Sequence, residues 1–203
     1  FVAVPAADCR GNATGKLGAA ACGSLGYAIP DAMYAKKVVV LTDTLLPYPL
    51  PDWAISENWV DYVVQVDAIG DPKGILSGTT RITRDPVGLV MADTAAQVIA
   101  ASGLLQDGFS FQTGAGGASL AAAASLKEIM LRDNIQSSFA LGGITGYLVE
   151  MLRAGCFRQL MDVQCFDLDA VASIRDDPRH REISAGHYAA PGTRGAVVDS
   201  LDV

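Results

Sequence analysis

The order of apolar and polar residues predicts a chain that alternates between strands and helices. Residues 38–41 are wholly apolar and rich in β-branched side chains, which is typical of an interior parallel strand covered on both faces. Alternating or apolar runs predict further strands at 60–66, 109–113, 135–141, 159–166 and 195–201. We therefore expect a sheet built from short, mostly buried strands.

Helices are expected between these strands. Asp85 and Pro86 suit the N-cap and first position of a helix that runs to about Ala101 and stops at Gly103. Its apolar side chains predict tight packing: Val87, Val90, Met91, Ala95, Val98 and Ile99. Other helices are expected near 27–35, 118–132, 146–154 and 168–177, while 180–194 is expected to be loop. This alternation with short connections predicts a parallel α/β sheet.

The stretch FSFQTGAGGAS, residues 109–119, is the strongest candidate for chemistry. It predicts a strand, a glycine-rich turn and then a helix with one apolar stripe (Leu120, Ala123, Leu126 and Met130). Glycines let a backbone approach a ligand closely, and the first amides of a helix bind anions. A second glycine turn is expected at 142–146. If both turns lie at one sheet edge, their amides would stabilise a carbonyl oxygen that becomes an oxyanion.

Common phosphate motifs do not fit this stretch. No G-x-x-x-x-G-K-[ST] occurs in the chain, and Ser119 stands where G-x-G-x-x-G requires its third glycine. A P-loop or dinucleotide site is therefore not expected. A tight structural connection without a ligand remains the alternative interpretation of each glycine cluster.

Composition limits the classes of protein further. The 203 residues are 50% hydrophobic with a mean hydropathy of +0.28, which is enough for a buried core in one domain or two partial ones. No apolar run approaches the roughly 20 residues of a membrane span, and no basic region precedes residues 1–4. We expect a cytoplasmic protein without membrane partners. Without a starting Met, the chain resembles a piece of a longer polypeptide.

Charge and cysteine content exclude further kinds of partner and site. The net charge is −7 and the basic residues are scattered, so nucleic acid is not an expected partner. The four cysteines form no C-x-x-C pair and the chain has two histidines, so no metal site is expected. Buried reduced thiols are the favoured interpretation, with a disulfide framework as the alternative.

Long stretches of the chain resemble the citrate lyase α subunit family. They are, in order, ACGSLGYAIPDAMYAKKVVVLTD, VDYVVQVDAIGDPKGILSGTTRITRDPVGL, DGFSFQTGAGGASLA, GGITGYLVEML, MDVQCFDLDAV and DDPRH. The resemblance implies a CoA-transferase-like fold (the NagB/RpiA/CoA-transferase type), a three-layer α/β fold with parallel sheets. It also implies that residues 1–84 end a first domain and that 85–203 begin a second one.

The resemblance also implies an activity. Members of this family exchange acetate for citrate on the thiol of a CoA-like phosphopantetheine group, which a small acyl carrier (γ) subunit carries, and a β subunit then cleaves the citryl thioester. In related CoA-transferases a glutamate forms a covalent intermediate, but Gly146 occupies the comparable position here and Glu150 lies a helical turn later. The resemblance therefore implies direct transfer through a mixed anhydride, without a metal in this subunit.

The resemblance places candidate residues on this chain. The catalytic candidates, which would hold the acyl oxygen, are Gly116, Gly117, Gly143 and Thr145. The candidates for contacts to the thioester or pantetheine arm are Gln112, Thr113, Gly114, Ala115 and Gly142, and Arg81, with Arg84 beside it, would bind citrate carboxylates. Ordinary turn bonds and solvated surface arginines are the alternatives. His180, in a polar segment, is expected to be exposed and not a catalytic base.

Other functions remain open at this point. One is a different CoA-transferase or acetyl-CoA hydrolase of the same fold, including the citramalate lyase α subunit. Another is a non-catalytic piece that only binds a ligand or assembles with partners. Exchange assays with citrate and citramalate would distinguish these possibilities.

Overall fold

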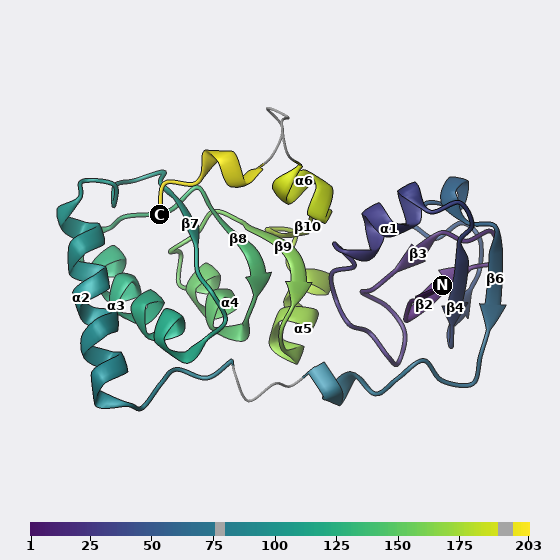
Figure 1. Ribbon diagram of the computed structural model, residues 1–203, viewed down its shortest axis with the longest axis horizontal. Helices are drawn as coiled ribbons and strands as arrows, with labels where there is room; N and C mark the ends of the chain where they lie inside the picture. The colour runs from purple at the N-terminus through teal and green to yellow at the C-terminus, as the bar shows by residue number, and fades with distance from the viewer. Residues whose placement is uncertain (76–79, 191–196) are drawn as a thin grey trace.

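The computed structural model describes residues 1–75, 80–190 and 197–203. Elements before residue 75 gather at one end of the molecule, and those after residue 85 form the other end (Figure 1). We refer to these two parts as the N-terminal lobe and the C-terminal lobe.

The N-terminal lobe is built on a small parallel sheet in which the predicted interior strand lies at the centre. Its order is β1 (Val2–Ala3), β4 (Val39–Thr42) and β6 (Tyr62–Gln65). The apolar strand β4 therefore has a parallel neighbour on both sides, as its β-branched residues predict. A second sheet has the order β3 (Ala13–Thr14), β2 (Ala6–Asp8) and β5 (Leu45–Leu46).

One helix and two short 3-10 turns complete this lobe. The helix predicted near Pro30 is confirmed as α1 (Ala28–Tyr34). The 3-10 turns are η1 (Glu57–Trp59) and η2 (Pro72–Ile75). The core packs Val4, Val38, Val40 and Ile55 together with small residues, so a lobe of this size is held by few large side chains.

The C-terminal lobe contains the predicted parallel sheet. Its strands are β7 (Ser110–Gln112), β8 (Phe139–Ile144), β9 (Leu160–Cys165) and β10 (His180–Glu182), in the order β10-β9-β8-β7. All three neighbouring pairs are parallel. Because all four strands are parallel, their carboxyl ends lie at one edge of the sheet, where α/β proteins bind ligands.

Two predictions near the end of the chain are wrong. The segment expected to be loop from residue 180 contains β10 and α6 (Ala185–Ala189), and residues 191–194 lie outside the described part. The expected last strand is the 3-10 turn η3 (Val197–Ser200), with residues 195–196 also outside the description. The polar sequence of this segment does not predict a strand. β10 forms because it pairs with β9, which is a tertiary contact.

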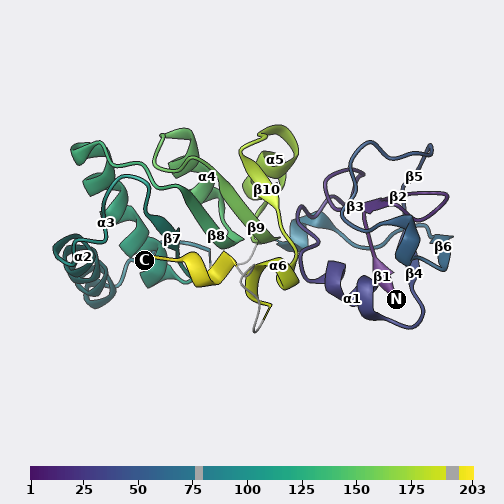
Figure 2. The same cartoon turned by 90° about the horizontal axis from the view of Figure 1, so that it is seen from above.

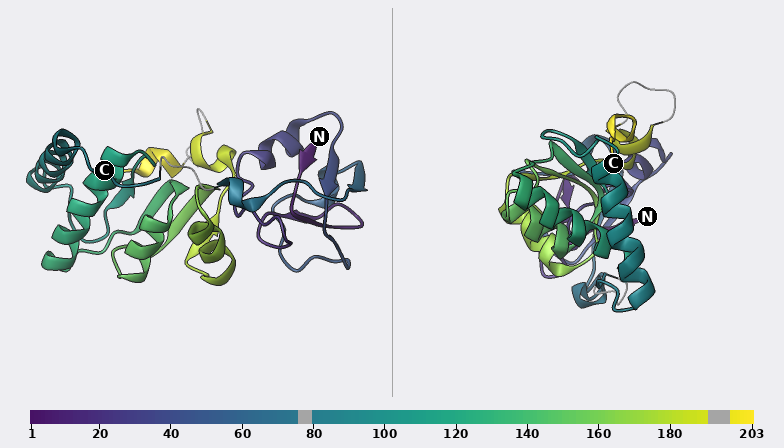
Figure 3. Two further views of the ribbon diagram at one scale, coloured as in Figure 1. Left: turned by 90° about the horizontal axis from the view of Figure 1, so that it is seen from below. Right: turned by 90° about the vertical axis from the view of Figure 1, so that its left-hand side faces the viewer.

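The helices lie on both sides of this sheet, in three layers. The predicted helices are α2 (Pro86–Ala101), α3 (Gly117–Asp133), α4 (Gly146–Arg153) and α5 (Leu168–Asp176). Figures 2 and 3 show α3, α4 and α5 on one face and α6 with the C-terminal segment on the other. The stripe predicted on α3 is confirmed, because Leu120, Ala123, Leu126 and Met130 are all buried.

Helix α2 forms where predicted but packs through different residues. Asp85 caps it by accepting a hydrogen bond from the Gly88 amide at 2.8 Å. The residues that pack are the small Gly88, Ala92 and Ala96, whereas most of the predicted packing residues are exposed (Val87, Val90, Met91, Ala95 and Val98), with Ile99 half-buried. The reason is that α2 lies against α3 at the end of the lobe rather than on the sheet (Figure 1). In the described part of the chain, no helix is both long and apolar enough to cross a membrane.

Candidate active site at the sheet edge

The first glycine-rich segment connects β7 to α3, as predicted. Gly116 is the N-cap residue and α3 begins at Gly117. Gly116 is exposed, and a side chain added there would meet no atom within 4 Å. Gly117 is different, because a Cβ there would lie 2.9 Å from the carbonyl oxygen of Arg81, and its own carbonyl accepts a hydrogen bond from the Thr83 amide at 3.0 Å. The turn therefore has free space for a side chain at Gly116, whereas at Gly117 the backbone of residues 81–83 fills that space.

Arg81 meets this turn through its backbone. Its side chain is exposed, and Arg84 is exposed beside it. The two arginines line an open hollow of about 640 Å³ together with Ile82 and Thr83. The structure thus brings Arg81 to the glycine turn, but its guanidinium remains at the surface.

The side chain of Gln112, the last residue of β7, lies across the neighbouring strand β8. Its side-chain amide donates a hydrogen bond to the Tyr188 hydroxyl at 2.8 Å. The same side chain lies over Gly142, where an added Cβ would come within 3.4 Å of the Gln112 Nε2. Thr113 turns back to the backbone, donating to the Ser119 carbonyl at 3.2 Å. The two glycine segments are therefore adjacent, and Gln112 lies between them.

The second predicted glycine turn is wrong in its boundaries. Gly142 and Gly143 belong to β8, which ends at Ile144, and only Thr145 separates the strand from α4. The pairing of β8 with β9 shifts register between the two glycines, and Gly142 has a φ of +113°. The glycines therefore permit an irregular strand, which a side chain would resist, rather than a turn.

Two side chains from the end of β9 occupy this region. The Phe166 ring lies directly against Gly143, at a spot that any side chain on that glycine would fill. Asp167 accepts hydrogen bonds from the Gly146 amide at 2.6 Å and from the Ala170 amide at 2.9 Å, so one carboxylate binds the N-termini of α4 and α5. The Thr145 hydroxyl is buried and has no hydrogen bond among the described residues. Sequence analysis missed Phe166, since nothing in the local pattern indicates its contact with Gly143.

A cavity of about 540 Å³ opens beside Phe166. It lies at the carboxyl end of β9 and is lined from both lobes, by Cys22, Ser24, Leu25, Tyr27, Ala28, Gly74, Ile75 and residues 163–166. Its position matches the general rule that α/β sheets bind ligands beyond the carboxyl ends of their strands. The predicted Gly143 is adjacent to this cavity because Phe166 touches both.

The two lobes meet through buried polar groups next to the cavity. Glu182 accepts a hydrogen bond from the Leu25 amide at 2.5 Å, and Ser24 donates to the Asp162 carbonyl at 2.9 Å. Burial raises the pKa of Glu182 above its ordinary value. Burial, together with the charge of Glu182, raises the pKa of Cys22 to about 11, so this thiol is protonated at neutral pH. All four cysteines are free, as the favoured interpretation predicts, but only Cys156 and Cys165 are buried, whereas Cys22 is half-buried and Cys9 is exposed.

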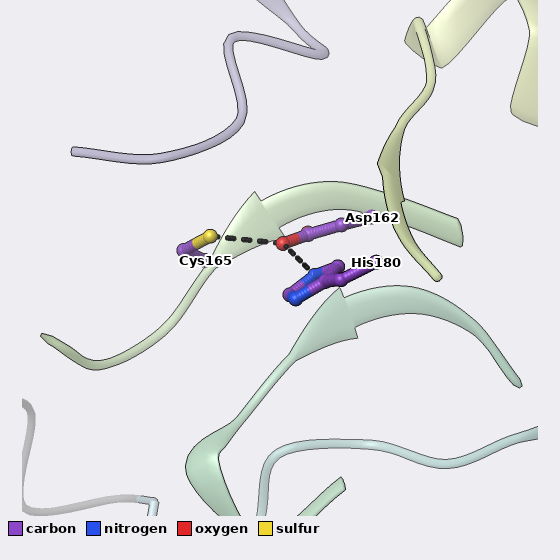
Figure 4. Close-up of side chains that lie close together, drawn as sticks. All are labelled: Asp162, Cys165 and His180. Atoms are coloured by element: carbon purple, nitrogen blue, oxygen red, sulfur yellow. Dashed lines mark hydrogen bonds and ion pairs between the residues drawn. The ribbon is translucent and has the colours of Figure 1, made fainter. Parts of the chain in front are cut away.

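The expectation that His180 is exposed is wrong. His180 is 3% exposed and its Nε2 lies 3.0 Å from Asp162 Oδ2 (Figure 4). Cys165 donates to the same oxygen at 2.9 Å. Pairing of β10 with β9 places His180 inside the lobe despite its charged neighbours in sequence.

A side chain at position 143 should destabilise the protein. In Gly143→Ala, the new Cβ would overlap the Phe166 ring, so we expect a loss of about 2 kcal/mol in the free energy of unfolding. Gly116→Ala is the matched control, because that position is open, and its change should stay within about 1 kcal/mol. Urea unfolding measures both. Adding Phe166→Leu to Gly143→Ala should cost less than the sum of the single changes, and strict additivity would disprove the contact.

Comparison with known proteins supports the resemblance. The family model "Citrate lyase, alpha subunit (CitF)" matches residues 1–203. The citrate lyase alpha chain of Haemophilus influenzae is 49% identical over 203 residues, which are 100% of this chain and 41% of that protein. The chain thus spans about 40% of the length of the curated relatives that it matches.

Solved structures agree with this assignment and confirm the fold. One, from Streptococcus mutans and described as the alpha subunit of citrate lyase in complex with citrate, has a TM-score of 0.93 and 49% identity, covering 98% of this chain and 39% of that one. A Pseudomonas malonate decarboxylase hetero-tetramer in complex with malonate has a TM-score of 0.58 at 21% identity, covers 80% of this chain and 30% of that one, and shares the fold alone. The predicted CoA-transferase-like α/β fold is confirmed. The chain belongs to the citrate lyase alpha subunit family.

Proposed function

We propose that the protein that contains this chain transfers an acyl-carrier thiol from acetate to citrate. In this reaction, acetyl-ACP and citrate give citryl-ACP and acetate. The observation that carries the proposal is the family match over the whole chain, together with 49% identity to a structure described as containing citrate. We further propose that residues 1–84 and 85–203 are parts of two related domains, and the gathering of elements into two lobes supports this division (Figure 1).

The site we propose lies at the carboxyl edge of the C-terminal sheet. The amides of Gly116 and Gly117, at the start of the 17-residue helix α3, would stabilise the acyl oxygen. Gly143 would make room for the Phe166 ring beside the substrate, and the buried Thr145 hydroxyl, unpaired among the described residues, would be a further donor. Gln112, Thr113, Gly114, Ala115 and Gly142 would contact the thioester arm. Arg81 would bind a citrate carboxylate.

Direct transfer, without an enzyme thioester, is supported by the residues around α4. Glu150 is the nearest glutamate in sequence to the position of the covalent residue, but its side chain is 64% exposed and pairs with Lys127 at 2.5 Å. A Cβ at Gly146 would lie 2.9 Å from the Asp169 Cβ, so a glutamate there would need α5 to move. We infer that citrate attacks the acetyl thioester itself, giving a mixed anhydride, and that the thiolate then attacks the citryl carbonyl and releases acetate.

The cofactor and partners follow from this proposal. A CoA-like phosphopantetheine group on an acyl carrier (γ) subunit would present the thioester, and the open cavity at the sheet edge has room for such a thin arm. A β subunit would cleave the product. We place the complex in the cytoplasm and propose no metal in the transfer step itself.

A transfer assay tests the proposed activity. The full-length protein is mixed with acetyl-ACP and ¹⁴C-citrate, and label on the carrier is measured. We expect labelled citryl-ACP, with ACP strongly preferred to free CoA and citrate to citramalate. Transfer to citramalate alone would favour the citramalate counterpart. Carrier binding without any transfer would favour the non-catalytic alternative.

Trapping experiments test the direct route. Hydroxylamine or borohydride added during turnover should leave Glu150 and every other glutamate unmodified, because no glutamyl thioester forms. Peptide mass spectrometry after digestion measures this. A modified Glu150 would contradict direct transfer while leaving the family assignment intact. A CoA-transferase with a known covalent glutamate serves as the positive control.

A further inference from the structure

The junction between the lobes contains a buried cluster of three side chains that the proposed function does not use. Asp162 and Cys165 come from β9, and His180 from the adjacent β10. Figure 4 shows the Cys165 sulfur and one His180 imidazole nitrogen on either side of one Asp162 oxygen, each joined to it by a hydrogen bond. One donor atom from each residue lies within 4.8 Å of the other two, and all three residues are buried.

Hydrogen bonds within the cluster leave buried atoms unpaired. Asp162 Oδ2 accepts from both Cys165 and His180, but Asp162 Oδ1 and His180 Nδ1 have no partner among the described residues. The side chains of Asp162 and His180 are both 0% exposed. A buried carboxylate is costly unless it is paired with a cation or coordinates a metal, so an ion bound at Asp162 Oδ2 would offset the burial of this group.

The charges around the cluster favour a cation. Asp162 lies near the buried Glu182, and its charge helps to raise the pKa of that carboxyl after the larger effect of burial. Lys16 reaches Glu182 only at 3.9 Å and binds Asp52 more closely, at 2.7 Å. Asp162 and Glu182 thus bring two carboxylates to this interior, and Lys16, which pairs with Glu182, lies closer to Asp52.

We propose that Asp162, Cys165 and His180 bind a divalent zinc ion that links β9 to β10 next to the lobe junction. One carboxylate oxygen, one thiolate and one imidazole are a donor set that zinc accepts. On binding, the Cys165 thiol proton leaves to solvent, and His180 binds through Nε2 while its proton resides on Nδ1. Water fills the fourth position. This site differs from the expectation of no metal, because the three ligands are brought together by the pairing of β9 with β10 and not by spacing in the sequence.

The geometry requires small movements. Zinc bond lengths of about 2.0–2.3 Å place tetrahedral donors roughly 3.3–3.7 Å apart. The Asp162 oxygen lies 2.9 Å from Cys165 Sγ and 3.0 Å from His180 Nε2, so each of these two distances must lengthen by roughly 0.3–0.8 Å. Cys165 lines the cavity of about 540 Å³ and His180 lines another of about 770 Å³, so the cluster lies between two cavities.

Cobalt substitution and metal analysis test this site without an activity assay. The purified protein is stripped with a chelator, dialysed against Zn²⁺ or Co²⁺, and analysed for bound metal and visible absorption. We expect one equivalent of zinc, a higher Tm with zinc, and with cobalt the thiolate charge-transfer and intense d–d bands of a tetrahedral site. No retained metal, or cobalt bound without a thiolate band, would overturn the proposal.

The chain offers matched controls for both ligand types. Cys165→Ala and His180→Asn should each lower the affinity for zinc at least tenfold, whereas Cys9→Ser and His187→Asn, which change exposed residues, should not. Circular dichroism confirms folding of each variant. If Cys165→Ala fails to fold, the cobalt spectrum of the unchanged protein still shows whether a thiolate binds the metal. Equal affinity in Cys165→Ala and the unchanged protein would overturn the site, while the transfer activity could still stand.

Discussion

Replacing Asp8 with alanine is expected to lower the free energy of unfolding by about 4 kcal/mol, because several buried amides would lose their acceptor. Asp8 is 0% exposed. Its Oδ1 accepts hydrogen bonds from the amides of Arg10, Gly11 and Asn12 at 2.9, 3.0 and 3.2 Å. Its Oδ2 accepts from the Leu50 amide at 3.1 Å and the Asn12 side chain at 2.8 Å. One carboxylate therefore holds the turn after β2 together and binds it to the segment around Leu50, which contains Pro47, Pro49 and Pro51.

Denaturation in urea measures this effect. Asp52→Ala is the control, because Asp52 is 66% exposed and its ion pair with Lys16 should contribute at most about 1 kcal/mol. Asp8→Asn should fall between the two, since its carbonyl oxygen still accepts some of the bonds while its NH₂ group faces amide donors. A change below about 1 kcal/mol in Asp8→Ala would show that water replaces the carboxylate without cost.

The same carboxylate predicts a dependence on pH. Burial by itself acts to raise the pKa of Asp8, but the hydrogen bonds from Asn12, Leu50 and Arg10 outweigh it, and the pKa lies below its ordinary value. A lowered pKa means that Asp8 stabilises the fold above the pKa of the unfolded chain and loses this contribution as pH falls through the folded pKa. Stability should thus drop below about pH 4, and less steeply in Asp8→Asn.

Gly116→Val is expected to reduce transfer by about a hundredfold in the full-length protein while leaving its fold intact. The open space around Gly116 and its φ of −71° and ψ of 154° suit valine, so stability should change by less than about 1 kcal/mol. The branched side chain would instead project where the acyl group must approach the first amides of α3. The loss should therefore appear in kcat/KM and not in Tm.

Gly70→Val is the matched control for this experiment. Gly70 also has no atom within 4 Å of an added Cβ and does not have a positive φ, but it lies in the N-terminal lobe. Its transfer rate should stay within twofold of the unchanged protein. Unchanged transfer in Gly116→Val would exclude the β7–α3 turn from the site, and an equal loss in both variants would indicate a general effect of added bulk.

Sequence alone determined the parallel sheet and its helices. Apolar runs, the Asp85–Pro86 start and the buried stripe on α3 are local signals, and the structure confirms the elements they predict. The family also followed from sequence, because long matching stretches are far more specific than a single glycine motif. These signals succeed because hydrophobic periodicity and capping act between residues close in the chain.

Only the tertiary structure decided which residues meet. The contact between Gly143 and Phe166, the binding of the Gly146 amide by Asp167, and the burial of His180 beside Asp162 each join segments that are separate in sequence. The same holds for α2, whose large apolar residues are exposed because it packs through alanines and a glycine. Strand pairing and helix position determine these contacts. The local sequence pattern cannot predict them, because the burial of a residue depends on which distant segment packs against it.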